Sequence, residues 1–296
     1  MSDPANREPV ARKIELATGL TYNVLEWGGD DLSRTHTLVL VHGFLDLAWG
    51  WAPMVRNLPP HYHVIAPDMR GHGDSDRVGA GGYYYFFDYV ADLHSLIDQL
   101  GRDTVSVVGH SMGGSISSYY TGSYPKTVHR LALLEGMGPP EQATPVPDRL
   151  VAWVTSWKKT RARALREYPD IAAAADRLGK HDPLLDPALA LELAEHGTRV
   201  TEAGTRVFKH DQMHLTMGPY PFRLEVARSF WQRVTCPVLL VEGAESKMRH
   251  HKDEAQSRYA SFADARQEVL QGAAHMMQRH QPAALAKLLT TFLADQ

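Results

Sequence analysis

Short runs of apolar residues alternate with amphipathic segments along most of this chain. The runs are rich in Val, Leu and Ile and are too short to form helices. Such runs are typical of strands buried inside a parallel sheet, whereas the first two strands are expected to form a hairpin. The pattern predicts strands at residues 12–16, 22–27, 37–41, 63–66, 104–108, 131–134, 237–241 and 267–270.

Helical periodicity fills the segments between these strands. Within residues 88–100, Val90, Leu93 and Ile97 fall on one face of a helix. The alternation of strands and helices predicts an α/β fold, in which a mostly parallel sheet is covered by helices on both faces. Further helices are expected at residues 49–58, 115–124, 254–262 and 282–293.

The segment between residues 139 and 228 has a different texture. Residues 136–147 are rich in Gly and Pro, and residues 150–204 show helical periods without a strand signal. The strand pattern returns only after this segment. We therefore predict a helical cap at residues 139–228, inserted into a core domain formed by residues 1–138 and 229–296.

Composition and charge narrow the class of protein. A chain of 296 residues with 44% hydrophobic residues can bury a large core, and its net charge of −3 gives no support for nucleic-acid binding. The single cysteine, Cys236, excludes an intrachain disulfide and fits a reducing compartment. No apolar run approaches the roughly 20 residues that span a bilayer, and residues 1–13 lack an apolar signal core. These features predict a cytoplasmic protein without a membrane span.

Two histidine pairs resemble metal ligands by their spacing. They are His61 with His63, and His250 with His251. Neither pair has further ligands at a supporting distance in the sequence, so both are expected to be surface residues. We therefore predict no metal site and no cofactor.

One stretch carries a specific chemical signature. Residues 109–113 read Gly-His-Ser-Met-Gly and lie between a predicted buried strand and a predicted helix. A serine between two glycines on such a turn is the pattern of a nucleophile elbow. The turn is so tight that a side chain at either glycine would clash, and it lifts the Ser111 hydroxyl clear of the sheet. It also directs the N–H of Met112 toward the same point.

Four motifs, in the same order and at similar separations, make the chain resemble the capped α/β hydrolases. The resemblance covers nearly the whole chain and implies the α/β-hydrolase fold, with an eight-stranded sheet and an inserted helical cap. It also implies a serine hydrolase. The motifs are residues 42–44 (His-Gly-Phe), 68–75 (Asp-Met-Arg-Gly-His-Gly-Asp-Ser), 109–113 and 272–275 (Gly-Ala-Ala-His).

This resemblance assigns roles to single residues. Ser111 would attack the substrate, and His275, on the loop after the last strand, would take the proton from its hydroxyl. The backbone N–H groups of Met112 and Phe44 would stabilise the oxyanion that forms during acyl transfer. His42 is expected to brace the loop that carries Phe44.

The acid that should orient His275 departs from the usual pattern. Most relatives carry it after the next-to-last strand, where the usual positions here hold Ser246 and Lys247. Glu245 stands one position early, and Glu135 stands at the end of the preceding strand. Either glutamate could orient the imidazole and stabilise its cation. We place Glu135 first, because it ends a strand expected beside the elbow strand, and keep Glu245 as the alternative acid.

A serine nucleophile excludes relatives that use aspartate there, such as haloalkane dehalogenases and epoxide hydrolases. We expect hydrolysis of an ester-like bond (carboxylic ester, thioester or lactone) in a small apolar substrate through an acyl-serine. Trp49 and Tyr85 are candidates to line the substrate pocket, although packing in the core or cap would also explain each of them.

Two other function classes stay open. One is a non-hydrolytic ligand-binding or scaffold member of the fold. The other is cofactor-free oxygen chemistry or perhydrolysis in the same site. The sequence also leaves open whether the chain forms a homodimer.

Overall fold

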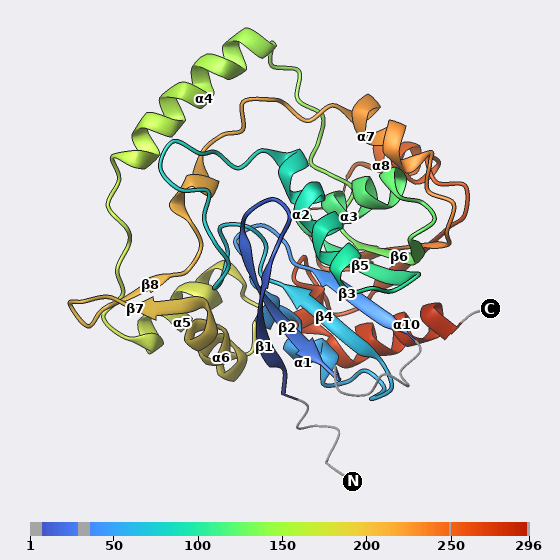
Figure 1. Ribbon diagram of the computed structural model, residues 1–296, viewed down its shortest axis with the longest axis horizontal. Coiled ribbons are helices and arrows are strands. Elements are labelled where there is room, and N and C mark those ends of the chain that lie inside the picture. The colour runs from blue at the N-terminus through green and yellow to red at the C-terminus, as the bar shows by residue number, and fades with distance from the viewer. Residues whose placement is uncertain (1–7, 29–35, 249, 295–296) are drawn as a thin grey trace.

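The computed structural model describes residues 8–28, 36–248 and 250–294, so the polar start of the chain, residues 1–7, lies outside the description. One sheet of eight strands forms its centre, in the order β1-β2-β4-β3-β5-β6-β9-β10 (Figure 1). β2 pairs antiparallel with β1 and β4, and the other neighbours are parallel. The predicted α/β fold with a mostly parallel eight-stranded sheet is confirmed. The strands are β1 (Val10–Glu15), β2 (Thr21–Trp27), β3 (Thr37–Val41), β4 (His63–Pro67), β5 (Val105–His110), β6 (Val128–Leu134), β9 (Val238–Gly243) and β10 (Ala265–Leu270).

Helices cover both faces of this sheet. Those labelled α2, α3, α7 and α8 pack into one buried cluster, and α1, α9 and α10 pack into another on the opposite face. No helix in the described residues is both long and apolar enough to cross a membrane. The bounds are η2 (Ala48–Trp51), α1 (Ala52–Val55), α2 (Phe86–Gln99), α3 (Met112–Ser123), α7 (Leu224–Trp231), α8 (Lys252–Tyr259), α9 (Met277–His280) and α10 (Pro282–Ala294).

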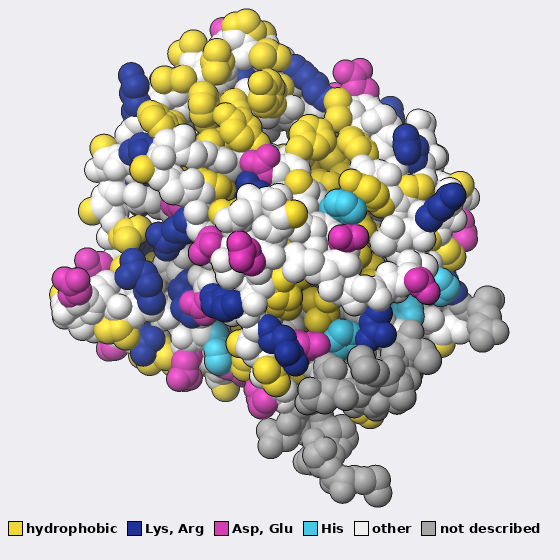
Figure 2. Space-filling model, viewed as in Figure 1, with side chains coloured by type: hydrophobic (Ala, Val, Ile, Leu, Met, Phe, Trp, Pro, Cys, Tyr) yellow, Lys and Arg dark blue, Asp and Glu magenta, His cyan; other side chains and the backbone are white. Residues whose placement is uncertain are grey.

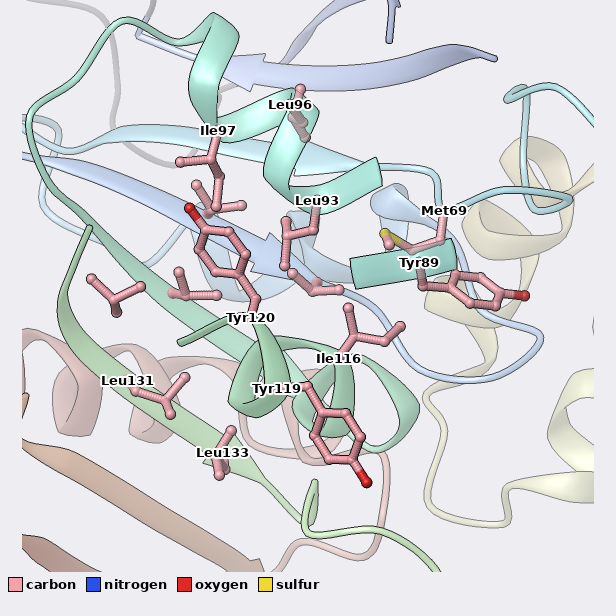
Figure 3. Close-up of a cluster of buried hydrophobic side chains, with 14 of the residues drawn as sticks. Met69, Tyr89, Leu93, Leu96, Ile97, Ile116, Tyr119, Tyr120, Leu131 and Leu133 are labelled. Carbon is pink, nitrogen blue, oxygen red and sulfur yellow. The ribbon is translucent and has the colours of Figure 1, made fainter. Parts of the chain in front are cut away.

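Strand side chains alternate between the two buried clusters. In β6, Leu131 and Leu133 belong to the cluster of α2 and α3, whereas Leu134 belongs to that of α1 and α10. Figure 3 shows the first cluster, where Leu93 of α2 and Ile116 of α3 gather with the β6 leucines. This period of two is that of a strand buried on both faces. Each such side chain stabilises the fold by roughly 1.5–3 kcal/mol, so the carboxyl ends of the central strands are held firmly.

The segment between β6 and α7 is mainly helical and lies along one side of the sheet, on the left in Figure 1. α5 and α6 share a small apolar cluster of their own, which includes Ala174, Leu185 and Leu193. This helical texture agrees with the pattern from which the cap was predicted. The elements are α4 (Val146–Arg161), α5 (Ile171–His181), α6 (Pro187–Gly197), β7 (Thr198–Val200), β8 (Arg206–Phe208) and η3 (Gln212–Leu215).

This segment also contains a hairpin that the sequence pattern did not predict. β7 and β8 pair antiparallel in a separate two-stranded sheet. Each strand is three residues long, which is too short for a period of two to stand out. A positive φ at Gly204 closes the connection between them.

The helix α7 lies across the predicted end of the cap at residue 228, but it packs with the core. The Trp231 Nε1–H donates to the Ser118 Oγ of α3 over 3.0 Å. A Cβ at Gly122 of α3 would lie 2.3 Å from the carbonyl oxygen of Phe230, so the two helices approach closely. The cap that we propose therefore ends before α7.

Candidate active site

Ser111 lies on a tight turn between β5 and α3. Its backbone angles, φ 53° and ψ −119°, fall where residues other than glycine are rare. A Cβ at Gly109 would lie 2.4 Å from the Gly113 carbonyl oxygen, and a Cβ at Gly113 would lie 2.2 Å from that of Val41. Both glycines are therefore required by close backbone contacts. The Ser111 N–H donates to the Leu134 carbonyl over 2.9 Å, which fixes the turn to β6.

The turn leads directly into α3, whose first residue is Met112. The N–H at this position has no carbonyl of its own helix to bond. The N-terminal end of a helix also carries a partial positive charge. The Met112 N–H can therefore donate to a negatively charged oxygen held beside Ser111.

The loop after β3 passes close to the same serine. A Cβ at Gly43 would lie 3.2 Å from the Ser111 Cβ and 2.8 Å from the His110 Nδ1, so the loop is held tightly there. His42 braces the loop, because its Nδ1 donates to the Gly43 carbonyl over 2.8 Å and its Nε2 accepts a backbone N–H from the loop after β4 at 2.9 Å. Phe44 follows and is half exposed.

His275, on the loop after β10, is paired with Glu135 at the end of β6. The His275 Nδ1 lies 2.6 Å from the Glu135 Oε2. The same carboxylate accepts the Gly243 N–H at 2.9 Å and the Ser246 hydroxyl at 2.8 Å. Burial alone would raise the pKa of Glu135, but these hydrogen bonds, led by the one from His275, lower it below its ordinary value. The ionised carboxylate holds the Nδ1 proton, which leaves Nε2 as the proton-accepting nitrogen.

Backbone strain is concentrated at this edge of the sheet. Among the described residues, the non-glycine residues with positive φ are Leu45 (57°), Ser111 (53°) and Glu135 (45°). Each follows the carboxyl end of one of three neighbouring strands, β3, β5 and β6. Residues held in such conformations cluster at functional sites. The strain therefore favours a functional site at this edge.

Glu245, the alternative acid, points elsewhere. Its backbone N–H donates to the Ala273 carbonyl over 2.9 Å, and its side chain is exposed. Beside it, Ser246 fills a usual position of the acid and donates its hydroxyl to Glu135. The sequence analysis gave Ser246 no role. The only sequence signal for such a role was that Ser246 stands where the acid is usually expected. The structure brings Glu135, and not Glu245, to His275.

His110, inside the elbow motif, supports the loop that carries His275. Its Nε2 donates to the His275 carbonyl oxygen over 2.8 Å, and the two rings lie 4.7 Å apart. Burial, and to a smaller extent the proximity of His275, lowers the pKa of His110 to about 3. The ring is therefore neutral near pH 7 and adds no charge beside His275. The sequence analysis did not predict this hydrogen bond. Its only sequence signal was that His110 lies within the motif of residues 109–113.

A cavity of about 400 Å³ opens at Ser111, and Glu135 and His275 also line it. Its walls are mainly apolar, and the described lining residues include no Lys or Arg. Such cavities suit a small apolar ligand whose orientation is set by a few polar groups. The apolar walls include Phe44, Phe86, Met112, Met137, Leu240 and Tyr259.

Trp49 and Tyr85, the two expected pocket residues, are not among the described residues that line this cavity. The Trp49 indole stacks on His196 at 3.5 Å between ring centroids, and its Nε1–H donates to Glu192 over 2.9 Å. It therefore joins the core to α6. Tyr85 is 42% exposed, and its ring packs edge-to-face with Tyr83 at 5.2 Å between ring centroids. Each ring is thus occupied outside the cavity.

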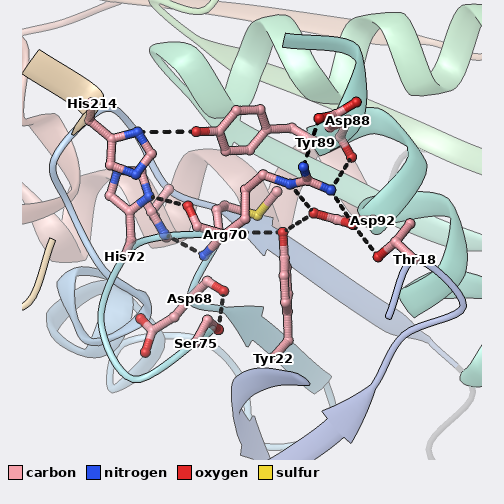
Figure 4. A network of polar contacts seen from close by, with 12 residues as sticks. Thr18, Tyr22, Asp68, Arg70, His72, Ser75, Asp88, Tyr89, Asp92 and His214 are labelled. Carbon is pink, nitrogen blue, oxygen red and sulfur yellow. Dashed lines mark hydrogen bonds and ion pairs between the residues drawn. The ribbon is translucent and has the colours of Figure 1, made fainter. Parts of the chain in front are cut away.

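A network of buried polar groups holds the loop after β4 beneath this site (Figure 4). The Arg70 guanidinium pairs with Asp92, with 2.8 Å between Nη2 and Oδ1, and with Asp88 at 2.8 Å. From the same loop, the His72 Nε2 accepts the Leu45 N–H at 3.2 Å, directly beyond Phe44. Because buried ions are stable only when paired, this network fixes the loop firmly.

Comparison with known protein families shows the family to which the chain belongs. A family model described as the alpha/beta hydrolase fold matches residues 36–279. The chain therefore belongs to the α/β hydrolase fold family.

Individual proteins extend this comparison. A 2-(acetamidomethylene)succinate hydrolase from Mesorhizobium japonicum is 27% identical over 293 residues, covering 99% of this chain and 98% of that protein. A hypothetical protein from Pseudomonas aeruginosa PAO1 has a TM-score of 0.85 and 23% identity, covering 97% of this chain and 100% of the other. The thioesterase domain from the curacin biosynthetic pathway has a TM-score of 0.82 and 24% identity, covering 95% and 99%. The protein is a hydrolase of the α/β-hydrolase superfamily.

Proposed function

We propose that this protein is a serine hydrolase that cleaves an ester-like bond of a small apolar substrate through an acyl-serine intermediate. One observation carries the proposal. A histidine paired with a buried carboxylate lines the same cavity as a serine on a strained elbow. In the proposed triad, Ser111 is the nucleophile, His275 is the general base and Glu135 is the acid.

The first step forms the acyl-serine. The Ser111 Oγ attacks the substrate carbonyl carbon while its proton passes to the His275 Nε2. Glu135 keeps the imidazole in the required tautomer and stabilises the cation that forms. The carbonyl oxygen becomes an oxyanion, which the N–H groups of Met112 and Phe44 would receive. As the oxyanion collapses, the bond to the leaving group breaks, and the leaving group takes the proton from His275.

The second step releases the acid. Water replaces the leaving group, and His275 removes one of its protons as the oxygen attacks the acyl carbon. Collapse of this second tetrahedral intermediate breaks the bond to the Ser111 Oγ. That oxygen recovers a proton from His275, and a carboxylic acid leaves.

The walls of the cavity support an apolar acyl group. A carboxylate or phosphate placed among apolar side chains would lose its hydration without an ionic partner, which is unfavourable. The named substrate of the Mesorhizobium relative is a succinate, which carries two carboxyl groups. Because the described lining residues include no Lys or Arg, we propose a different, uncharged acyl group for this chain.

The helical segment after β6 completes the proposed site as a cap. Pro139 and Pro140, its first residues, line the cavity beside Met137. The Trp49 contact with Glu192 ties α6 of the same segment to the core. A cap of this kind would shield the acyl-serine from bulk water.

The test combines active-site labelling with ester hydrolysis. Fluorophosphonate should label the wild-type protein at Ser111, and p-nitrophenyl esters of increasing acyl length should be hydrolysed. Ser111→Ala should remove both, whereas Ser115→Ala is the matched control, because Ser115 lines the same cavity and donates to the Gly136 carbonyl. Turnover of the esters at the wild-type rate by the Ser111→Ala variant would exclude the proposed mechanism. A wild-type protein that neither labels nor turns over esters would favour a ligand-binding role.

A further inference from the structure

A second cavity, of about 650 Å³, lies between α4, the chain that follows it, α5 and the segment from β8 to η3. Its character is opposite to that of the Ser111 cavity. The described residues that line it include basic side chains and no Asp or Glu. The basic ones are Lys159, Arg163, Arg166, Arg177, His181 and His210.

Three of these cations have no charge partner within the described part of the chain. The side chains of Lys159, Arg163 and Arg177 form no hydrogen bond or ion pair with another described residue. Close by on α5, Lys180 is paired with Asp176. The cation beside the cavity is thus paired with a carboxylate, whereas these three cations, which line the cavity, are not.

The positive charge around this cavity is opposite in sign to the net charge of the whole chain. The net charge is −3, yet six of the described residues that line this cavity are basic. Figure 2 shows Lys and Arg side chains, in dark blue, on the left of the view below α4, with Asp and Glu side chains, in magenta, among them. Lys159, Arg163 and Arg166 are exposed, so water screens much of the repulsion between them, and they can contact a bound anion. The concentration of positive charge therefore indicates an anionic ligand.

The two cavities are lined by residues that are adjacent in the chain. Phe44 lines the Ser111 cavity, and Leu45, the next residue, lines the cationic cavity. A smaller cavity of about 80 Å³ is lined by both Phe44 and Leu45, and it shares Phe208 and His210 with the cationic cavity. A substrate with its reacting carbonyl at Ser111 could therefore extend past Phe44 toward the cations.

We propose that the cationic cavity binds the phosphate groups of the leaving group, and that the substrate is a thioester whose thiol carries a phosphorylated nucleotide, as in an acyl-coenzyme A. This inference rests on the proposed function. The acyl group occupies the apolar cavity. The thiol leaves with a proton from His275, and its phosphates stay bound to the cations until release.

The chemistry of the lining residues fits this ligand better than a single carboxylate. Guanidinium groups bind phosphate oxygens through paired N–H donors, and several of them match a group that carries several negative charges. Tyr168 and Phe208 add aromatic walls, with 5.4 Å between their ring centroids, and the Arg166 guanidinium lies over Tyr168 at 5.3 Å. Such walls can pack against a base. The volume is within the range of sites that enclose a ligand of this kind.

The first arm of the test measures binding alone, so it does not depend on turnover. Adenosine 3′,5′-bisphosphate is titrated into the full chain by calorimetry, and inorganic phosphate is titrated in parallel. The nucleotide should bind, and the double variant Arg163→Ala/Arg177→Ala should weaken its binding by about tenfold or more. The matched control, Lys158→Ala/Lys180→Ala, removes the same charge from residues that do not line the cavity and should bind like the wild type.

The second arm separates the leaving group from the acyl group. An acyl-coenzyme A and the acyl-pantetheine with the same acyl chain are compared as substrates. In the Arg163→Ala/Arg177→Ala variant, KM for the coenzyme A ester should rise by about tenfold, while kcat and the kinetics of the phosphate-free ester stay unchanged.

Three results would overturn the inference. The first is a wild-type protein that does not bind the bisphosphate. The second is an equal loss of nucleotide binding in the two double variants, which would show that only the overall charge of the protein matters. The third is phosphate binding as tight as nucleotide binding with no preference between the two esters, which would make the cavity a site for free anions. Binding of the nucleotide by a protein that hydrolyses no ester would instead refute the proposed function alone.

Discussion

The Ser246 hydroxyl donates a 2.8 Å hydrogen bond to the Oε2 of Glu135, the same oxygen that accepts the His275 Nδ1–H. Ser246 follows β9, where the resemblance to capped α/β hydrolases led us to expect the acid, and Glu135 follows the neighbouring strand β6. A hydroxyl at one strand end therefore supports a carboxylate at the next. This relationship makes the arrangement of the site testable residue by residue.

The first prediction concerns the acid. Glu135→Gln should lower kcat for ester hydrolysis by about 10³- to 10⁴-fold, because the imidazole loses the charge that fixes its tautomer and stabilises its cation. Glu245→Gln is the control, since that side chain is exposed, and it should hydrolyse esters normally. Steady-state kinetics on one ester decide the matter. The reverse outcome, a crippled Glu245→Gln beside an active Glu135→Gln, would move the acid to the later strand.

The second prediction concerns Ser246 as a positioning residue. Ser246→Ala removes one of the hydrogen bonds to Glu135 but leaves that of the Gly243 N–H, so kcat should fall by only about three- to tenfold with KM unchanged. Ser246→Thr keeps a hydroxyl and should restore most of the rate. If both variants lose activity equally, the hydrogen bond is not the cause.

The third prediction concerns the elbow glycine. Gly113→Ala should destabilise the fold by about 2 kcal/mol or more, because its Cβ would lie 2.2 Å from a backbone oxygen that cannot easily move. Gly179→Ala in α5 is a useful control, since its Cβ would meet nothing within 4 Å. In a helix interior that change should be neutral or stabilising by up to about 1 kcal/mol. Urea unfolding of both variants gives the two values, and equal stabilities would contradict the steric account.

The fourth prediction concerns pH. The pKa of Glu135 is lowered in the folded protein from its ordinary value of 4.5. In acid the unfolded chain therefore binds a proton at this residue before the folded chain does. The stability that Glu135 contributes is fully present above about pH 4.5 and is lost as the pH falls through the lower folded pKa. The difference in unfolding free energy between the wild type and Glu135→Gln should shrink over that acidic window. A difference independent of pH would contradict the lowered pKa, and Glu245→Gln supplies the baseline.

Much of the sheet was predictable because its signals are local. The apolar run before Gly109 and the helix that follows specify a strand, a turn and a helix within one short stretch. The turn at Ser111 is dictated by the glycines on either side, whose missing side chains are needed whatever the rest of the chain does. These features depend on steric rules that act between sequence neighbours.

Other features depend on contacts between distant residues. Which glutamate reaches His275 is decided by the pairing of β6 with β9 and by the direction of two side chains, and neither is encoded locally. Trp49 was expected in the pocket because it is large and apolar, but its Nε1–H donates a hydrogen bond to a carboxylate on α6. The cationic cavity could not be predicted from the net charge of −3, because a sum over the chain does not show which charges lie close together in space.

The strands that carry Ser111 and Glu135 are consecutive in the chain and adjacent in the sheet, and α3 joins them. Hydroxyl and carboxylate therefore belong to one βαβ unit. The imidazole comes from a loop after β10, on the far side of β9. Loops open at a lower free energy than central strands. Mild heating should therefore displace the imidazole while the sheet is intact, so that inactivation precedes unfolding and is reversed on cooling.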